Sequence, residues 1–257
     1  MDEAALQHAR DIVASSRRTV FLTGAGISTA SGIPDYRGPD GVWTKNPGAE
    51  QRSTIAVWMS DASVRRAGWQ RRATTSWDSV QPNAAHHAIT AYVARRANDL
   101  VVTQNIDGLH QRAGLSLEQL IEIHGTVHRS VCMSCGEQLD IAATLARVIG
   151  GEEDPRCLRI MGSSPCGGIM KAATISFGQS LREDDLNHAF LAARDCDVLI
   201  AAGSTLAVFP IASMVPLALE NGATVIVMNG SPTAMDRFAQ FVFSDDLTLS
   251  LPALLDT

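Results

Sequence analysis

"TVFLTGAGIS", residues 19–28, reads as a buried strand, a tight glycine turn and the first residues of a helix. Because Gly24 and Gly26 lack side chains, such a turn lets backbone N–H groups and a helix N-terminus face a pyrophosphate. The usual dinucleotide fingerprint G-x-G-x-x-G is incomplete, since its third glycine position holds Thr29. The turn therefore suggests nucleotide binding without excluding an ordinary β-to-α connection.

Short apolar runs that end in small or polar residues recur along the rest of the chain. These runs are "DLVVTQN" (99–105), "DVLIAAGS" (197–204), "ATVIVMNGS" (223–231) and "QFVFSD" (240–245). Runs rich in Val, Ile, Leu and Phe are typical of strands buried on both faces of a parallel sheet. Helical patterns lie between the runs, for example at 84–96 and 209–222. The alternation predicts an α/β fold with a doubly wound, Rossmann-like parallel sheet.

Two segments interrupt this alternation. Residues 38–83 form a Trp- and Arg-rich helical stretch without a good strand, and residues 129–171 carry four cysteines, a helical piece and loops. Both look like insertions into the main sheet, so we expect them to form a smaller domain made of a helical segment and a zinc-binding module. The expected Rossmann-like domain consists of residues 1–37, 84–128 and 172–257.

Composition narrows the classes of partner. The 257 residues are 46% hydrophobic and carry a net charge of −6, so no strong positive field invites nucleic acid or an anionic membrane. The first ten residues, "MDEAALQHAR", are acidic and amphipathic, unlike a secretory signal, and no apolar run approaches a membrane span. We expect a soluble cytoplasmic protein with neither nucleic acid nor membrane as a partner.

Polar side chains follow the predicted strands where the strands end. In parallel α/β sheets ligands bind at the carboxyl ends of the strands, so these groups should converge on one site. The stretch "VVTQNIDGLH" (101–110) shows the change most clearly, because two buried valines are followed by amide, carboxylate and imidazole groups. The simpler interpretation of that stretch is a polar turn with an N-cap for the next helix. The convergent groups are Gly24 to Ser28, Gln104 to Asp107, Gly203 to Thr205 and Asn229 to Ser231.

The cysteines point to a metal rather than to disulfides. There are five, an odd number, and the N-terminus has no signal peptide. Cys132 and Cys135 form a C-x2-C half-site, in which two thiolates on one turn suit a tetrahedral zinc. Cys157 and Cys166 are separated by eight residues, an unusual spacing that a loop between ligands can accommodate at little entropic cost. A degenerate or partial site is the alternative, and Cys196 is expected to be a buried thiol.

Several motifs in order resemble one known family. The motifs are "GAGIS…SGIPDYRG…GVW", "PNAAHHA", "TQNIDGLHQRAG", "EIHGTVHRSVCMSC", "CGG", "FG" and "GSTLAVFP". They resemble the sirtuins, the NAD-dependent protein deacylases, from about residue 19 to residue 231. The resemblance implies that NAD is a consumed co-substrate, that zinc is structural, and that acyl-lysine proteins or peptides are the substrates.

The resemblance also assigns roles to residues. Asn105 and Asp107 become catalytic residues whose amide and carboxylate groups suit a carboxamide such as that of nicotinamide. His124, which follows a strand in "EIHG", becomes the general base, because imidazole titrates near neutrality. Leu247 falls where the family has a small residue against adenine. The implied NAD-binding residues are Gly24, Ala25, Gly26, Ile27, Ser28, Asp35, Tyr36, Arg37, Gln104, Asn105, Ile106, Asp107, Gly203, Ser204, Thr205, Asn229, Gly230, Ser231 and Leu247.

In the implied reaction, the acyl-lysine carbonyl oxygen attacks the anomeric carbon of the nicotinamide ribose and nicotinamide leaves. His124 then activates a ribose hydroxyl, and the products are free lysine and an O-acyl-ADP-ribose. The segment "ATISFGQSL" (173–181) matches the strand against which a substrate peptide pairs. It departs from the family at Ala172, Ala173 and Gln179, where Pro, Asp and Glu are usual. The implied substrate residues are Ile175, Phe177, Gly178 and Arg71.

The helical insertion bears on acyl preference. Sirtuins that prefer succinyl resemble one another in a Tyr-x-x-Arg pair, which aligns here with Gly68 and Arg71. A shift of one residue gives Trp69 and Arg72, and the Arg-then-Trp pattern is similar to the branch with mitochondrial lipoamidase-type members. Because the phenol is missing and Gly68 should leave room, we expect neutral acyl groups to be removed faster than succinyl.

Three alternatives to protein deacetylation stay open at this point. The first is mono-ADP-ribosyl transfer from the same pocket, the second a deacylase specialised for longer or unusual acyl groups, and the third a non-catalytic NAD-sensing module. An ordinary dehydrogenase is disfavoured by the broken glycine fingerprint. His110 is expected to orient the polar cluster, whereas a structural role is expected for His86, His87, His128 and His188.

Overall fold

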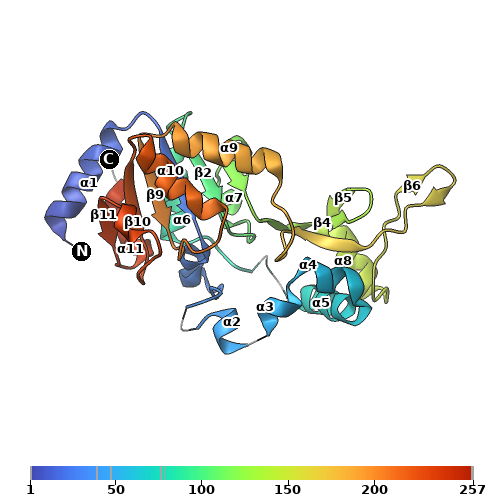
Figure 1. Cartoon of the computed structure of the whole chain (residues 1–257). Coiled ribbons are helices and arrows are strands. Elements are labelled where there is room, and N and C mark those ends of the chain that lie inside the picture. Colours follow the sequence, from blue (N-terminus) through green and yellow to red (C-terminus); the bar gives the residue numbers. More distant parts are fainter. Residues whose placement is uncertain (1, 39, 47, 76, 78, 256–257) are drawn as a thin grey trace.

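The main sheet has the predicted architecture. The computed structural model (Figure 1) describes residues 2–255, apart from residues 39, 47, 76 and 78. Within that part of the chain, parallel strands pair in the order β3–β2–β1–β9–β10–β11, so the order reverses between β1 and β9, where ligands bind in such sheets. The strands are β1 Thr19–Thr23, β2 Leu100–Thr103, β3 Leu120–Glu122, β9 Val198–Ala202, β10 Thr224–Met228 and β11 Phe241–Phe243.

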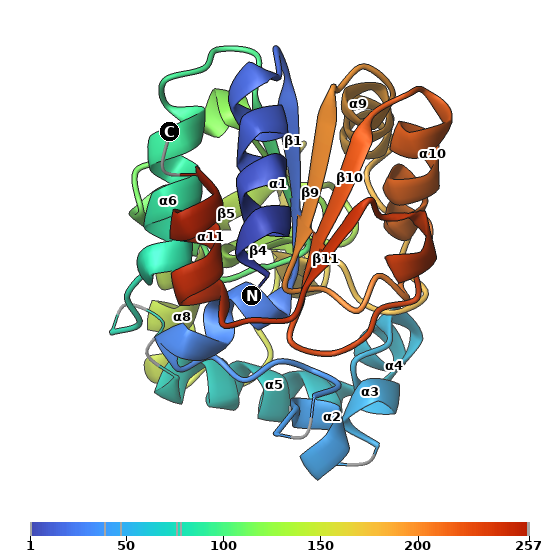
Figure 2. The same cartoon turned by 90° about the vertical axis from the view of Figure 1, so that its left-hand side faces the viewer.

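Both faces of the sheet are buried, which explains the unbroken apolar runs. Side chains alternate along a strand, so Val20 and Leu22 of β1 enter one core while Phe21 enters the other. Helices α9 and α10 cover the first face, and α1, α6 and α11 cover the second (Figure 2). Their bounds are α1 Glu3–Ser15, α6 Ala84–Val93, α9 Glu183–Arg194, α10 Met214–Glu220 and α11 Leu247–Leu255.

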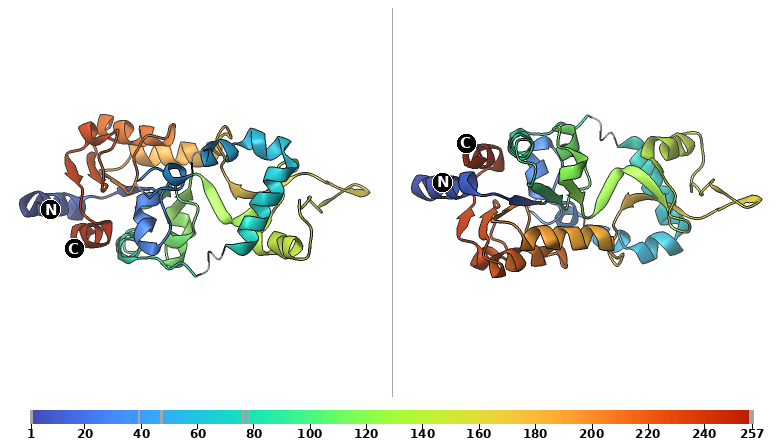
Figure 3. Two further views of the ribbon diagram at one scale, coloured as in Figure 1. Left: turned by 90° about the horizontal axis from the view of Figure 1, so that it is seen from below. Right: turned by 90° about the horizontal axis from the view of Figure 1, so that it is seen from above.

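The two interrupting segments lie together beside the sheet (Figures 1 and 3). Trp69 of the helical segment packs in one apolar cluster with Val148 and Met170 of the cysteine segment, and all three are buried. Strands β5, β4 and β8 form an antiparallel sheet in that order. The elements are α2 Val42–Lys45, α3 Ala49–Arg52, α4 Ile55–Ser60, α5 Ala62–Thr74, β4 Gly125–Cys132, β5 Gln138–Asp140, α8 Ile141–Ile149, β6 Ile160–Met161, β7 Ser164–Pro165 and β8 Met170–Thr174.

Two predicted helices differ in detail from the structure. The helix after the glycine turn is a 3₁₀ helix, η1 Ala25–Ser31, because the chain must turn tightly against a neighbouring loop. The helix predicted over 209–222 starts as η3 Ile211–Ser213 and continues as α10. The remaining short elements are α7 Leu109–Arg112, η2 Leu117–Gln119 and η4 Asp236–Phe238. In the described part of the chain no helix has the length and apolar character needed to cross a membrane.

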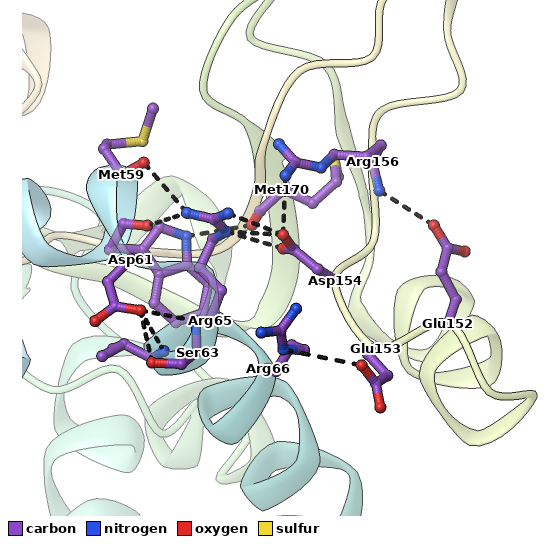
Figure 4. A network of polar contacts seen from close by, with 12 residues as sticks. Met59, Asp61, Ser63, Arg65, Arg66, Glu152, Glu153, Asp154, Arg156 and Met170 are labelled. Carbon is purple, nitrogen blue, oxygen red and sulfur yellow. Dashed lines mark hydrogen bonds and ion pairs between the residues drawn. The ribbon is translucent and has the colours of Figure 1, made fainter.

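One buried ion pair ties the helical segment to the cysteine segment (Figure 4). The side chain of Arg65 on α5 is 5% exposed and binds Asp154 through two nitrogens, with Nε 2.9 Å from Oδ1 and Nη2 2.9 Å from Oδ2. Its Nη1 donates to the carbonyl oxygens of Trp58 and Met59. The neighbouring Arg66 makes a longer contact of 3.8 Å with Glu153, and both of these side chains are exposed.

We predict that Arg65→Ala destabilises the protein by about 3 kcal/mol, because it removes one partner of a buried ion pair. Arg66→Ala is the matched control, since an exposed pair contributes roughly 0–1 kcal/mol. Urea unfolding followed by circular dichroism measures both free energies of unfolding. Equal losses in the two variants would show that the pair of Arg65 and Asp154 does not hold the segments together.

Candidate active site

Three glycines bring two βα turns into contact at the carboxyl edge of the sheet. The N–H of Gly26 donates to the carbonyl oxygen of Gly203 at 2.7 Å, and that of Gly24 donates to Ala202 at 3.0 Å. Gly203 has φ +67°, and a Cβ there would lie 2.3 Å from the backbone nitrogen of Ile27. Only glycine fits this position, so the turn after β1 and the turn after β9 form one continuous floor.

A cavity of about 1930 Å³ opens above this floor. Ser28 and Asp107 do not line it, because both are buried behind Asn105, where Ser28 accepts from Asn105 and donates to Asp107. The other predicted residues meet there from separate parts of the chain. The cavity is lined by Gly24, Ala25, Gly26, Ile27, Asp35, Tyr36, Arg37, Gln104, Asn105, Ile106, His124, Gly203, Ser204, Thr205, Asn229, Gly230, Ser231 and Leu247, and by the predicted substrate residues Arg71, Ile175, Phe177 and Gly178.

The polar cluster after β2 is held by its own hydrogen bonds. The side-chain amide of Asn105 donates to the carbonyl oxygen of Gly24 and to Ser28 Oγ, each at 3.1 Å. Ser28 Oγ in turn donates to Asp107 Oδ2 at 2.8 Å. The other oxygen of Asp107 accepts the N–H of Leu109 at 3.0 Å, at the start of α7. Asp107 therefore begins a helix, as the simpler interpretation held, and also holds Ser28 in place behind the cavity wall.

His124 has the tautomer and the protonation state that a general base requires. Its Nδ1 lies 3.0 Å from the carbonyl oxygen of Gln104. Because a carbonyl can only accept, Nδ1 carries the hydrogen and Nε2 keeps a free lone pair. Burial lowers the pKa of His124 below its ordinary value, against the opposing effect of the hydrogen bond to Gln104. The imidazole is therefore neutral at pH 7 and able to accept a proton.

The expectations for the other histidines hold only in part. His87 and His188 are exposed, on α6 and α9. His128 donates to the carbonyl oxygen of Asp107 at 2.9 Å, and His86 lies 3.5 Å from Ser28 Oγ, which fits the structural role expected of them. His110 does not contact the carboxylate of Asp107, because its Nε2 faces Thr23 Oγ1 at 3.1 Å. Sequence spacing shows which face of a helix a histidine occupies, but not which strand end lies opposite.

An aromatic group covers one side of the cavity. The rings of Tyr36 and Trp43 are 4.6 Å apart, and Trp43 is 5.2 Å from Phe177. The guanidinium of Arg37 stacks on Trp43 at 4.5 Å. Burial and the charge of Asp107 raise the pKa of Tyr36, so its hydroxyl is un-ionised at neutral pH. Tyr36, Arg37 and Trp43 thus form an aromatic group that lies against the predicted peptide segment at Phe177.

The expected room at Gly68 is not present. A Cβ on Gly68 would lie 2.7 Å from the ring of Trp58, which fills the space that a tyrosine side chain would need. Lys171 was not predicted as a site residue, but it lines the cavity and is only 3% exposed. Its ammonium donates to the carbonyl oxygens of Ala172 and Thr174. The sequence held one signal for Lys171 as a site residue, because it is a lysine within an otherwise apolar strand.

Two basic side chains, Arg72 and Lys171, line the cavity near Gly68 without an acidic partner among the described residues. Burial lowers the pKa of Lys171 to about 7, and the charge of Arg72 adds to this effect. Burial, followed by the charge of Arg71, lowers the pKa of Arg72 to about 10. Within the described residues the guanidinium of Arg72 has no hydrogen bond or ion pair. Arg72, rather than the exposed Arg71, is therefore the arginine that lines the cavity with a buried guanidinium and no hydrogen-bond or ion-pair partner among the described residues.

The predicted peptide segment is partly occupied. The N–H of Phe177 donates to the carbonyl oxygen of Ser53 at 3.2 Å, and its carbonyl oxygen accepts from Ile55 at 2.9 Å. These bonds use the backbone of Phe177 that a paired peptide would need. Further along, the N–H groups of Gly178, Ser180 and Leu181 have no partner within the described residues, and all three residues line the cavity.

The four clustered cysteines fit a tetrahedral metal. Their sulfur atoms all lie within 4.8 Å of one another. Cys132 Sγ is 3.8 Å from Cys166 Sγ, and Cys135 Sγ is 3.6 Å from Cys157 Sγ. Zinc–sulfur bonds of about 2.3 Å in a tetrahedron place the sulfurs about 3.8 Å apart. The donor atoms and spacing thus suit one zinc ion.

The unusual spacing between Cys157 and Cys166 has a structural cause. The intervening residues form the hairpin of β6 and β7, which turns at Gly162 and projects from the molecule (Figure 3). At its base the N–H of Gly167 donates to the carbonyl oxygen of Cys157 at 3.0 Å. The two ends of the hairpin are therefore close together, which places the thiolate of Cys166 near that of Cys157.

Comparisons with known proteins agree with this geometry. The sequence profile of the Sir2 family matches residues 24–210. NAD-dependent protein deacetylase 2 of Streptomyces coelicolor is 42% identical over 235 residues, which cover 91% of this chain and 95% of that protein. NAD-dependent protein deacetylase of Haloarcula marismortui is 36% identical over 257 residues, 96% of this chain and 93% of that protein.

A solved structure shows the same fold. Sir2 with a p53 peptide and NAD+ superimposes with a TM-score of 0.83 at 27% identity, covering 98% of this chain and 97% of that one. The sequence similarity extends over nearly the whole chain, and the fold similarity includes both the main sheet and the segments beside it. The chain therefore belongs to the Sir2 family.

Proposed function

We propose that the protein is an NAD-dependent protein-lysine deacylase, which transfers the acyl group from lysine to ADP-ribose and releases nicotinamide. The arrangement of His124 carries this proposal: a neutral imidazole with a free Nε2 lines the same cavity as the glycine floor and Asn105. The names of the relatives support it, since they are NAD-dependent protein deacetylases. NAD is a co-substrate in this proposal, so no hydride acceptor is required.

The proposed roles follow from the positions of the residues. The turn of Gly24 and Gly26 has no side chains over the cavity floor, so the phosphates of NAD can approach the backbone there. Asn105 holds the nicotinamide end, Asp107 supports Asn105 through Ser28, and His124 Nε2 accepts a proton from a ribose hydroxyl. An acyl-lysine peptide would pair with the N–H groups of Gly178, Ser180 and Leu181 by strand addition, which reads backbone more than sequence.

The division of the chain is part of the same proposal. Residues 1–37, 84–128 and 172–257 would form the NAD-binding domain, and 38–83 with 129–171 the small domain. The shared apolar cluster around Trp69 and the pair of Arg65 with Asp154 support that grouping. We also propose a cytoplasmic location, supported by five cysteines of which none forms a disulfide.

We predict that His124→Ala lowers the rate of deacylation about 100-fold or more, the usual contribution of a general base. NAD binding measured by calorimetry should remain close to that of the wild type, because the glycine floor is unchanged. His87→Ala is the matched control, since His87 is an exposed histidine on α6. Turnover near that of the wild type in a folded His124→Ala protein would remove His124 from the mechanism.

The pH profile is a second readout of the same assignment. A base must be unprotonated, so kcat/KM should fall as the pH drops through the pKa of His124. Burial lowers that pKa, so the fall should begin below about pH 6.5, the ordinary value for histidine. An activity that rises toward acid pH would contradict the assignment.

One observation favours a specialised acyl group. Arg72 and Lys171 line the cavity without an acidic partner among the described residues, and no extra room exists at Gly68. The structure thus contradicts one reason for expecting neutral acyl groups to be removed faster than succinyl, namely free space beside Gly68. We propose instead that the pocket accepts acyl chains that end in a carboxylate, with Arg72 as the partner.

We predict that Arg72→Met lowers kcat/KM for a succinyl-lysine peptide about tenfold, through loss of a charge-assisted hydrogen bond. The acetyl form of the same peptide should change little. Side-by-side kinetics of both peptides, with Arg71→Met for comparison, measure the effect. A larger succinyl defect in Arg71→Met would return the role to Arg71, and equal acetyl and succinyl defects in Arg72→Met would contradict a carboxylate site.

We predict one zinc per chain, bound by Cys132, Cys135, Cys157 and Cys166. Cys157→Ser should lose the metal and lower the free energy of unfolding, because zinc binding contributes to the folding of so small a module. Cys196→Ser should keep one zinc, since Cys196 lies in the core beside the main sheet. Metal analysis by mass spectrometry of freshly purified protein measures the content. Equal zinc in both variants would exclude Cys157 as a ligand.

A further inference from the structure

Lys171 on β8 brings a buried basic group close to the proposed base. The residue is 3% exposed and lines the cavity. Its Nζ donates to the carbonyl oxygen of Ala172 at 3.3 Å and to that of Thr174. The peptide group that joins Thr174 to Ile175 also donates its N–H to the carbonyl oxygen of His124 at 2.8 Å. A single peptide group therefore separates the head of Lys171 from the backbone of His124.

The hydrogen bonds of Lys171 distinguish its two protonation states. A charged ammonium has three hydrogens and no lone pair, whereas a neutral amine has two hydrogens and one lone pair. The two carbonyl oxygens accept two hydrogens, so the neutral form is already satisfied as a donor. The charged form keeps one N–H for which the described residues offer no acceptor. That N–H suits an anionic ligand in the cavity.

Arg72 on α5 is the charged group that acts on Lys171. Burial and then the charge of Arg72 lower the pKa of Lys171 to about 7, and no carboxylate of the described residues contributes. The β4 residue paired with Lys171 is Val131, which has no charge. Tyr36 acts on Arg72, and both its hydroxyl and the imidazole of His124 are neutral at pH 7. A carboxylate beside Arg72 would supply negative charge and stabilise the charged form of Lys171.

We infer that Lys171 determines acyl specificity: its third N–H and the guanidinium of Arg72 together bind the terminal carboxylate of the acyl chain, so the preference for acidic over neutral chains falls as the pH rises. The inference rests on the proposed carboxylate pocket and adds to it an anchor on β8. A succinyl chain ends in a carboxylate that stays ionised above about pH 5.5, whereas an acetyl group ends in a methyl group. Because the pKa of Lys171 is about 7 and that of Arg72 is about 10, Lys171 is the anchor that loses its charge between these values.

Peptide binding tests the inference without requiring turnover. Two peptides of one sequence carry either succinyl-lysine or acetyl-lysine, and calorimetry measures the Kd of each for the full chain at about pH 6 and about pH 8.5. We expect the succinyl peptide to lose about tenfold in affinity relative to the acetyl peptide over this range, the loss of one hydrogen bond to a charged group. Protonation of His124 affects both peptides alike, so the ratio of the two Kd values reports Lys171.

Two substitutions assign the pH dependence to Lys171. Lys171→Arg keeps the charge and Lys171→Met removes it, so the Kd ratio should no longer change with pH in either variant, and it should favour succinyl more strongly in Lys171→Arg. Arg71→Met serves as the control and should keep the pH dependence, because Arg71 is exposed. A pH-independent ratio in the wild type, or an unchanged pH dependence in a Lys171→Met protein with the wild-type Tm, would overturn the inference. Wild-type protein that shows the pH dependence but consumes no NAD would instead refute the proposed reaction.

Discussion

The contact between Gly24, Gly26 and Gly203 fixes where everything else in the site can lie. Adjacent strands of a parallel sheet end at the same edge, but their connecting turns are normally kept apart by side chains. Here the turns after β1 and β9 share a backbone hydrogen bond of 2.7 Å, and a Cβ at Gly203 would collide with Ile27. The cavity floor is therefore backbone, and Asn105 and His124 are held above it by bonds to the adjacent turn and strand.

The interior of the site is polar but built around neutral imidazoles. Burial lowers the pKa of His86, His110 and His124, so none of them adds positive charge beside a nicotinamide ribose that gains it during the proposed reaction. In the proposed function the basic groups Arg72 and Lys171 would lie at the acyl end instead. This separation supports the proposal that one end of the cavity carries the chemistry and the other selects the acyl chain.

The main sheet could be predicted because its strands are buried on both faces and so appear as apolar runs. The glycine turn and the polar strand ends likewise stand next to those runs in the sequence. Contacts between distant segments could not be predicted in the same way. Trp58 fills the space at Gly68, a hairpin reunites Cys157 with Cys166, and His86 meets Ser28 only because α6 packs on η1. Each of these contacts depends on side-chain volume or on packing between distant segments, and a local sequence pattern encodes neither.

The most direct test of the account is the identity of the products. The full chain is incubated with NAD+ and an acetyl-lysine peptide, and every product is identified by mass spectrometry. The account predicts deacetylated peptide, nicotinamide and O-acetyl-ADP-ribose in equal amounts. A peptide made heavier by one ADP-ribose would mean that the same pocket transfers ADP-ribose to protein, and an unchanged NAD+ pool would contradict an NAD-dependent reaction altogether.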